Sequence, residues 1–205
     1  MTAQRVAGLL LAAGGGRRLG GRPKALLEHD GRLLVEAGAA ALRAAGCDPV
    51  HVVIGAEAAR VRERAALPGC VLVENPDWGS GMGSSLRAGL ASLEGESCTA
   101  ALVALVDQPG IGAAAMARVR AACHSPAALA AAGYGGRRGH PVLLGSRHFA
   151  EVSRLARGDQ GARGFLRAQG AGLTLVECGD LAEPYDIDTT EDLRTRLRPG
   201  PRPER

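Results

Sequence analysis

The sequence predicts an α/β fold in three layers, in which helices cover both faces of a mostly parallel central sheet. Short apolar runs, of the length of buried strands, alternate with segments in which apolar residues recur at helical spacing. Two of these runs, residues 6–13 and 100–106, are apolar almost throughout, which is typical of strands covered on both faces. The chain has 205 residues, and we expect one domain over residues 1–198 and a disordered tail at 199–205.

The composition excludes several classes of protein. Apolar residues make up 46% of the chain, as in globular proteins, and no apolar run is long enough to cross a membrane. The net charge is +4, but the arginines are scattered and aromatic residues make up only 2%, so we expect no nucleic-acid surface. The five cysteines include no C-x-x-C pair, which argues against a zinc site and a disulfide framework. No signal peptide is recognised, and a cytoplasmic location is expected.

The first half of the chain alternates between strands and helices. Strands are predicted at 6–13, 50–55, 71–73 and 100–106, and helices at 35–45, 57–66, 86–93 and 113–122. Asp30-Gly31 signals a turn before the first helix, and Gly46 can end that helix. Residues 75–85 are too rich in glycine for regular structure, so Ser84 or Ser85 is expected to cap the helix that follows.

The second half begins with a predicted hairpin. Apolar residues 129–134 are followed by a basic, glycine-rich segment at 135–140 and by apolar residues at 141–144. This pattern is typical of two short strands around a turn. Two helices and a last strand are then predicted, at 147–156, 162–169 and 173–177. Thr189 or Thr190 can cap a final helix, because acidic residues stand in its first turn.

The segment directly after the first predicted strand has the composition of an anion-binding loop. Gly14, Gly15 and Gly16 lack Cβ atoms, so their N–H groups can close on an anion. Four cations follow at short range, namely Arg17, Arg18, Arg22 and Lys24. This combination suits a triphosphate or a pyrophosphate.

Two common phosphate-binding motifs do not fit this loop. A dinucleotide fingerprint needs a glycine where Leu19 stands, and Pro23 would interrupt the helix that should follow. A P-loop needs Ser or Thr after its lysine, whereas Lys24 precedes Ala25. A flexible loop with solvated arginines is the other interpretation, but the position behind a buried strand and the Pro-Lys end favour an anion site.

A carboxylate stands directly behind the most apolar predicted strand. Asp107 follows residues 100–106, where it is suited to hold Mg²⁺, which binds a few carboxylate, water and phosphate oxygens. The residues alone leave a second interpretation open, in which Asp107 forms a turn before Pro109. Asp186 and Asp188 form another acidic pair near the C-terminus.

Residues 11–24 read L-A-A-G-x-G-x-R-x-G-x-x-P-K, which resembles the signature of the MobA-like nucleotidyltransferases, closest to the molybdenum cofactor cytidylyltransferase branch. Further segments are similar to motifs of that family: N-P-x-W-x-x-G-x-x-S-S at 75–85, L-x-D-Q-P at 105–109, G-H-P-V-L at 139–143, G-D-x-G-A-R at 158–163 and D-I-D-T-x-E-D-L at 186–193. The last motif departs from the family pattern at Thr190, where proline is usual. The resemblance extends from about residue 9 to 193 and implies a three-layer, Rossmann-like nucleotidyltransferase fold.

The resemblance also implies roles for particular residues. Arg18 and Lys24 would be the catalytic cations that offset charge on the phosphates. Asp107 and Asp188 would hold Mg²⁺. The nucleotide would lie against Leu11, Ala12, Ala13, Gly14, Gly15, Gly16, Lys24, Asn75, Gly81, Ser84 and Ser85. The acceptor would lie against Gly139, His140, Pro141, Asp159 and Arg163, although Asp159 can equally be the cap of a helix.

The activity implied by the resemblance is nucleotidyl transfer from CTP to a molybdopterin-type, phosphorylated pterin cofactor, with release of pyrophosphate. Ala13 favours CTP, because guanylyl-transferring relatives typically have glycine at this position. A molybdoenzyme or its chaperone is a further expected partner. Two alternatives stay open: a flavin- or nicotinamide-dependent reductase of the nicotine-blue type on the same scaffold, and a non-catalytic carrier of the molybdenum cofactor.

Overall fold

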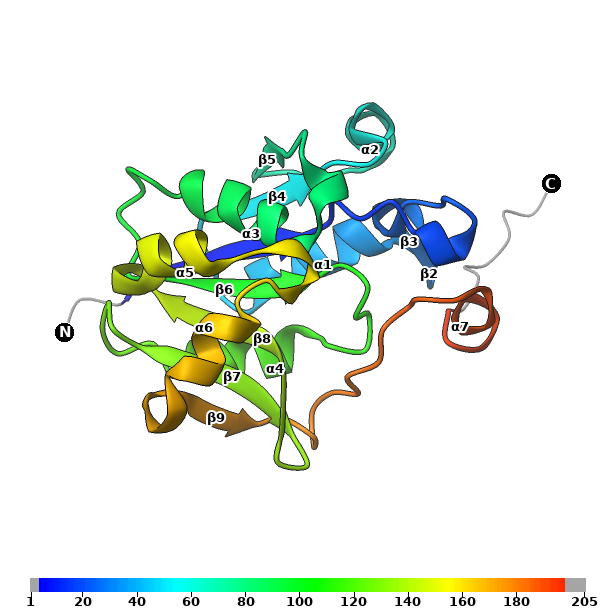
Figure 1. Cartoon of the computed structure of the whole chain (residues 1–205). Coiled ribbons are helices and arrows are strands. Elements are labelled where there is room, and N and C mark those ends of the chain that lie inside the picture. The colour runs from blue at the N-terminus through cyan, green and yellow to red at the C-terminus, as the bar shows by residue number, and fades with distance from the viewer. Residues whose placement is uncertain (1–3, 198–205) are drawn as a thin grey trace.

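The centre of the molecule is a seven-stranded sheet with the strand order β5-β4-β1-β6-β8-β7-β9 (Figure 1). A computed structural model describes residues 4–197, so the predicted tail at 199–205 lies outside the described residues. The strands are β1 Val6–Leu11, β4 Val50–Ile54, β5 Cys70–Glu74, β6 Ala100–Leu105, β7 Leu129–Tyr134, β8 Arg137–Gly145 and β9 Thr174–Glu177. β8 pairs antiparallel with β6 and with β7, and the other pairings in this sheet are parallel. The predicted mostly parallel α/β sheet is confirmed.

Helices cover both faces of the sheet, which gives three layers (Figure 1). On one face lie α1 Leu34–Ala44, α2 Ala58–Arg64 and α4 Ala113–Arg120, and on the other α3 Met82–Ala91, α5 Phe149–Leu155 and α6 Arg163–Ala168. A small hairpin, β2 Glu28–His29 and β3 Arg32–Leu33, lies at the same end of the molecule as α7 Thr190–Thr195. Within residues 4–197, no helix is long and apolar enough to cross a membrane.

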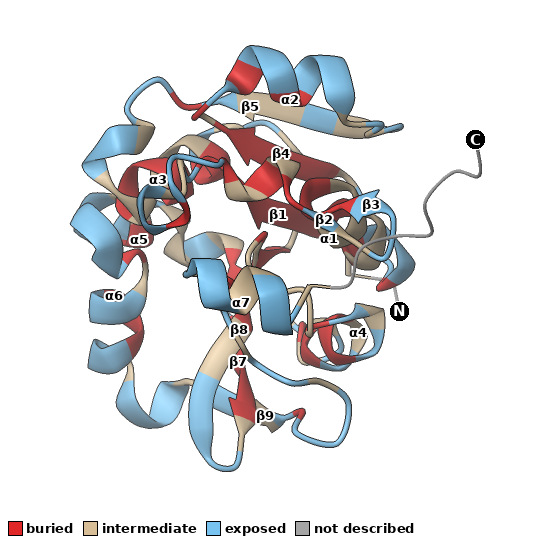
Figure 2. Ribbon diagram, turned by 90° about the vertical axis from the view of Figure 1, so that its right-hand side faces the viewer, coloured by how far each residue is buried: buried red, intermediate tan, exposed pale blue. Residues whose placement is uncertain are grey.

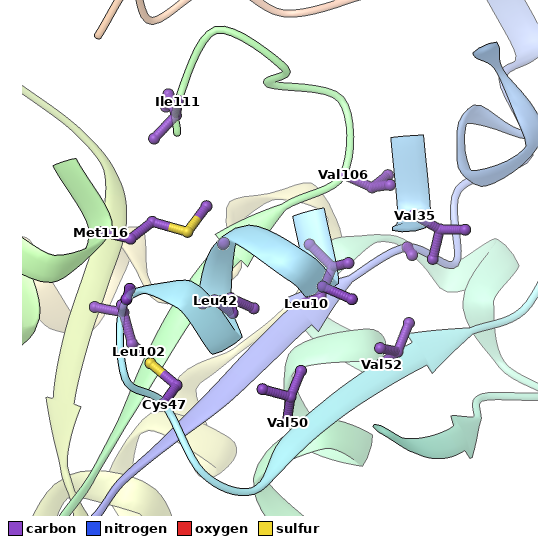
Figure 3. Packing of buried hydrophobic residues seen from close by; sticks show 14 of the residues in the cluster. Leu10, Val35, Leu42, Cys47, Val50, Val52, Leu102, Val106, Ile111 and Met116 are labelled. Carbon is purple, nitrogen blue, oxygen red and sulfur yellow. The ribbon is translucent and has the colours of Figure 1, made fainter. Parts of the chain in front are cut away.

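The core consists mainly of Ala, Val and Leu side chains, which alternate between the two faces of each strand. In β1, Leu10 packs toward α1 whereas Leu9 packs toward α3. Figure 2 shows that the strands are mostly buried while the outer sides of the helices are exposed. On the α1 face, Leu10, Leu42 and Val52 gather in one cluster (Figure 3), and each fully buried side chain of this size stabilises the fold by about 1.5–3 kcal/mol.

The start of α3 differs from the sequence prediction. The helix begins at Met82 with Gly81 as its N-cap, so Ser84 and Ser85 lie inside the helix and cap nothing. The preceding segment contains a short 3₁₀ helix, Trp78–Ser80. The predicted cap was wrong because both hydroxyl groups are buried and accept hydrogen bonds from the side chain of Asn75, an interaction that sequence spacing does not reveal.

Two local predictions are confirmed. Asp30 and Gly31 both have positive φ, 50° and 76°, and connect β2 to β3 in a tight turn. The Thr189 hydroxyl accepts from the Asp192 N–H group (3.1 Å), and the Asp192 carboxylate accepts in return from the Thr189 N–H group (2.7 Å). This reciprocal capping box begins α7.

The chain reverses its direction across the sheet between β1 and β6. From β1 the chain proceeds outward to β4 and β5, and α3 then returns it to β6 on the other side of β1. β1 and β6 thus flank the switch point of the sheet, although the helices that follow them, α1 and α4, pack on the same face. Ligands of open α/β sheets bind at the carboxyl ends of the strands at such a switch point. Because β8 runs antiparallel, the turn between β7 and β8 lies at the same edge of the sheet.

Candidate functional site

The glycine loop begins where β1 ends and is attached to the neighbouring strand β4. The N–H group of Ala12 donates to the carbonyl of Val53 (2.9 Å), and the N–H group of Ala56 donates to the carbonyl of Ala13 (3.0 Å). These bonds extend the β1–β4 ladder past the end of the sheet. The loop therefore starts from a fixed backbone position.

The loop then turns in a conformation that requires glycine at residue 16. Gly16 has φ 60°, and a Cβ atom there would lie 1.9 Å from the carbonyl oxygen of Arg22. Within the described part of the chain, the N–H groups of Gly14, Gly15 and Gly16 donate to no protein acceptor. Such unpaired amides at a strand end are available to an anion.

Lys24 connects the glycine loop to both predicted metal ligands. Its Nζ atom lies 2.6 Å from Oδ2 of Asp107 and 2.5 Å from Oδ1 of Asp188. The side chains of Lys24 and Asp107 are 15% and 19% exposed, and that of Asp188 is 43% exposed. Three side chains that are far apart in the sequence thus meet at one charged centre, which we call the Lys24 triad.

The electrostatics of the triad favour the charged ammonium. Burial by itself disfavours the charged form, but the Asp107 and Asp188 carboxylates outweigh this effect and raise the pKa of Lys24 above its ordinary value. Lys24 therefore carries its full positive charge at neutral pH.

The C-terminal segment that carries Asp188 is fastened to the end of β6. The N–H group of Ile187 donates to the carbonyl of Asp107 (2.9 Å), and the Ile187 side chain is fully buried. Beside this bond, Nε2 of Gln108, which follows Asp107, donates to Oδ1 of Asp186, which precedes Ile187 (2.7 Å). These contacts bring Asp107 and Asp188 together without help from a ligand.

A cavity of about 440 Å³ lies over the glycine loop, and we call it the loop cavity. Its cations come from the segment after the loop, and its carboxylates come from two other parts of the chain. The lining includes Leu11, Ala13, Gly14, Gly15, Arg17, Arg18, Lys24, Trp78, Gly81, Met82, Ser85, Asp107 and Asp159. Unpaired amides and three cations make this cavity complementary to a phosphate chain.

A second cavity of about 540 Å³ lies beside the first, and we call it the hairpin cavity. It is lined mainly by the β7–β8 hairpin and by α6, and includes Tyr134, Arg137, Arg138, Gly139, His140, Gln160, Arg163 and Asp186. Leu11 and Met82 line both cavities, so the two are adjacent. Three arginines make the hairpin cavity suited to an anionic molecule.

His140 is a neutral residue of the hairpin cavity. Burial lowers its pKa to about 4, and the nearby Asp186 carboxylate only partly opposes this effect. The imidazole is therefore uncharged at neutral pH and is able to act as a neutral hydrogen-bonding group toward a ligand.

Several predicted site residues lie behind the cavity walls. Asn75 donates to Ser84 Oγ (2.8 Å) and to Ser85 Oγ (3.1 Å), and its own Oδ1 accepts from the N–H group of Asp77 (3.0 Å). Asn75 and Ser84 thus hold the start of α3 in place, while Ser85 reaches the loop cavity. Ala12, Gly16, Pro141 and Asp188 also lie outside the two cavity linings.

Asp159 lies apart from the other residues predicted to bind the acceptor. It lines the loop cavity beside Gly81, whereas Gly139, His140 and Arg163 line the hairpin cavity. Asp159 caps no helix either, because α6 begins at Arg163 after Ala162 and has no side-chain cap. The loop that carries Asp159 reaches over the start of α3, which the sequence motif does not reveal.

Trp78 was not predicted as a site residue, yet it forms one wall of the loop cavity. Its ring lies so close to the glycine loop that a Cβ atom on Gly15 would be 2.9 Å from it, and one on Gly55 would be 2.6 Å from Trp78 Cβ. The signal that could have found it is its place as the single tryptophan in a glycine-rich, strand-end segment.

Asp107 and Asp188 fit a divalent cation. Both carboxylates already share one cation, the Lys24 ammonium, so their oxygens are close enough to share a metal ion. Among residues 4–197, no group of three or more His, Cys, Asp or Glu side chains could hold a metal. The remaining ligands would thus come from water and substrate phosphates, as is usual for Mg²⁺.

A family model and a known relative each match most of the chain. A model of the MobA-like NTP transferase domain matches residues 8–173. The nicotine blue oxidoreductase of Paenarthrobacter nicotinovorans is 42% identical over 195 residues, which cover 92% of this chain and 94% of that protein.

Solved structures of similar proteins share the fold. A homologue of Mycobacterium tuberculosis Rv0371c from Mycobacterium sp. strain JC1 has a TM-score of 0.81 at 31% identity, and the match covers 94% of this chain and 95% of that one. Rv0371c from M. tuberculosis, crystallised in complex with manganese, has a TM-score of 0.76 at 29% identity, with 96% and 99% covered.

Proposed function

The chain belongs to the MobA-like NTP transferase family, and from this premise we propose that it is a Mg²⁺-dependent cytidylyltransferase whose acceptor is a phosphorylated pterin cofactor. Family membership makes it a nucleotidyltransferase. The base, the acceptor and the metal are parts of the proposal. The observation that carries it is the Lys24 triad, two of whose residues line the loop cavity, beside a second cationic cavity.

The two cavities suit the two substrates of such a transfer. The triphosphate would lie in the loop cavity, with its phosphates on the glycine amides, Arg18 and Lys24. The acceptor would lie in the hairpin cavity, with its anionic group near Arg138 and Arg163. Leu11 and Met82, which line both cavities, mark where the two reacting groups would approach each other.

The protein would catalyse the reaction mainly by positioning the two substrates and by neutralising negative charge on the phosphates. A phosphate oxygen of the acceptor forms a bond to the α-phosphorus, and the bond from that phosphorus to the bridging oxygen breaks, so that pyrophosphate leaves with the electron pair. Arg18 and Lys24 offset the negative charge on the phosphates and on the leaving group. A divalent cation held by Asp107 and Asp188 would supply further charge neutralisation at the phosphates.

The base preference rests on Ala13. This residue is buried and lines the loop cavity, and its Cβ atom lies against Gly55. It thus narrows the space beside the glycine loop relative to a glycine at the same position. We take this as support for the smaller cytosine base.

The test is pyrophosphate release by the purified protein. Each of the four NTPs is incubated with molybdenum cofactor and Mg²⁺, and again with EDTA or without acceptor. We expect release that needs all three components and is fastest with CTP. No release with any NTP would refute a transferase of this kind, and release with GTP at least as fast as with CTP would refute the base preference.

A reductase of the nicotine-blue type is the second candidate, because a relative of that name is 42% identical over most of the chain. The glycine loop differs from the usual dinucleotide site, since it leads into a three-residue 3₁₀ helix, Arg17–Leu19, and not into an α-helix. Oxidation of NAD(P)H without NTP, or a yellow flavin in the purified protein, would favour this candidate.

A further inference from the structure

The Lys24 ammonium occupies the place between the two carboxylates that a divalent cation would need. Its Nζ atom contacts Asp107 Oδ2 at 2.6 Å and Asp188 Oδ1 at 2.5 Å, so it is the shared cation of the pair. A metal ion held by the same two carboxylates would lie close to the Lys24 ammonium, and the two positive charges would repel each other. Metal and ammonium therefore cannot occupy this position together.

Lys24 has a second place for its charge. It lines the loop cavity together with Arg17 and Arg18, next to the unpaired amides of the glycine loop. Its backbone N–H group is tied to the Gly14 carbonyl (3.4 Å), so the side chain can change partner while the backbone keeps its place. A triphosphate in this cavity would offer Lys24 anionic oxygens in exchange for the carboxylates.

From these contacts we propose that the Lys24 ammonium prevents free metal ions from binding to the Asp107 and Asp188 carboxylates. The ammonium leaves the carboxylates only when it pairs with the phosphates of a bound nucleoside triphosphate. This inference rests on the proposed function, because it takes the pair to be a metal site and the loop cavity to be the triphosphate site. The protein then binds metal and nucleotide together, as one complex. Metal alone is a weak ligand, and the paired state keeps Asp107 and Asp188 assembled between turnovers.

The experiment measures Mn²⁺ binding without turnover. Protein-bound Mn²⁺ is followed by electron paramagnetic resonance in the full chain, first with Mn²⁺ alone and then with CTP but no acceptor, and the Mn–CTP complex is calibrated separately. For the wild type we expect weak binding of Mn²⁺ alone and binding at least about tenfold tighter with CTP. Tight binding of Mn²⁺ alone to the wild type would overturn the inference.

Variants distinguish direct competition between the Lys24 ammonium and Mn²⁺ from repulsion of Mn²⁺ by the overall positive charge of the loop cavity. Lys24→Met removes the ammonium and should bind Mn²⁺ alone at least about tenfold more tightly than the wild type. Arg18→Met removes a cation from the same cavity that does not touch the carboxylates, and it should change the affinity by less than about threefold. Lys24→Arg keeps a cation at this position, so its affinity for Mn²⁺ alone should stay as weak as that of the wild type.

The outcomes are distinguishable from failure of the proposed function. If Lys24→Met binds Mn²⁺ no more tightly than the wild type, the inference is wrong. It is also wrong if the affinity of Arg18→Met for Mn²⁺ increases as much as that of Lys24→Met. If Lys24→Met loses its circular dichroism spectrum, the wild-type measurement with and without CTP decides. Absence of pyrophosphate release would refute the transferase but leave the Mn²⁺ measurement valid.

Discussion

His140 shows how burial, with smaller contributions from neighbouring charges, determines the charge of a residue in the hairpin cavity. Its folded-state pKa is about 4, whereas an unfolded histidine titrates near its ordinary value of 6.5. Between these two pH values the unfolded chain binds a proton that the folded chain does not bind. The free energy of unfolding must therefore decrease as the pH falls from about 6.5 to 4.

We expect His140→Gln to weaken this acid sensitivity. Between pH 7 and 4.5 the free energy of unfolding of the variant should fall by about 1–2 kcal/mol less than that of the wild type. Urea unfolding at a series of pH values measures it. His124→Gln, at an exposed position, is the matched control and should follow the wild type. Parallel curves for the wild type and His140→Gln would show that His140 is charged in the folded protein.

Asp107 is the residue on which the proposed chemistry depends most directly. Its carboxylate contacts Lys24, while its carbonyl accepts from Ile187 and is kept in any substitution. Asp107→Asn should lower kcat by at least about 100-fold, because it removes one of the two charges at the proposed metal site. Stability should change by only about 1 kcal/mol, since the ion pair is partly exposed.

The measurement is pyrophosphate release together with thermal melting. Asp77→Asn is the control, because Asp77 is an exposed carboxylate in the segment beside Trp78 and makes no contact with the triad. A variant Asp107→Asn with wild-type kcat would remove Asp107 from its proposed role.

At the scale of elements, the start of α3 and the loop of residues 156–161 form a seam in which backbone touches backbone. A Cβ atom on Gly83 would lie 2.8 Å from the backbone N of Arg157, and one on Gly81 would lie 2.5 Å from the backbone of Gly158. Arg87 adds a hydrogen bond from Nη1 to the carbonyl of Ala156 (2.6 Å). The seam matters because Met82 and the loop line both cavities.

We expect Gly83→Ala to force this seam apart. The new methyl group meets backbone that cannot rotate away, so stability should fall by about 1–3 kcal/mol and the KM for both substrates should rise. Gly164→Ala is the matched control: its Cβ atom meets nothing within 4 Å and lies in α6, so it should leave KM unchanged and raise stability by up to about 1 kcal/mol. Equal KM values for Gly83→Ala and the wild type would show that the seam does not position the cavities.

The elements with strong hydrophobic patterns were predictable from the sequence. β1, β4 and β6 are buried on both faces, and their apolar runs have no competing interpretation. The start of α3 was not predictable, because glycines hid the helix and the hydroxyl groups of Ser84 and Ser85 pair with Asn75 from another element. Tertiary contacts, which local patterns do not contain, decided this case.

At the scale of the molecule, the candidate site unites residues from both ends of the described chain. Lys24 and Asp188 are 164 residues apart, and no spacing rule joins them. The glycine loop could be read from residue types, but the role of Asp188 rested on family resemblance. The adjacency of the two cavities, and the side on which Asp159 lies, required the fold.

This joining of the chain ends predicts how ligands affect thermal unfolding. A ligand that bridges the glycine loop and the C-terminal segment stabilises only the folded protein, by about 2.7 kcal/mol at a concentration 100 times its Kd. In a domain of this size that corresponds to a rise in Tm of roughly 5–10 °C. CTP and Mg²⁺ together should therefore raise Tm by several degrees in one cooperative transition. This rise should exceed the sum of the rises with CTP alone and with Mg²⁺ alone.

The variant Asp188→Asn tests the part of the C-terminal segment in this effect. It should lose most of the rise in Tm while retaining the unliganded Tm within a few degrees, because the side chain is only partly buried. Differential scanning calorimetry measures it, and a full rise in Asp188→Asn would mean that the C-terminal segment takes no part in binding.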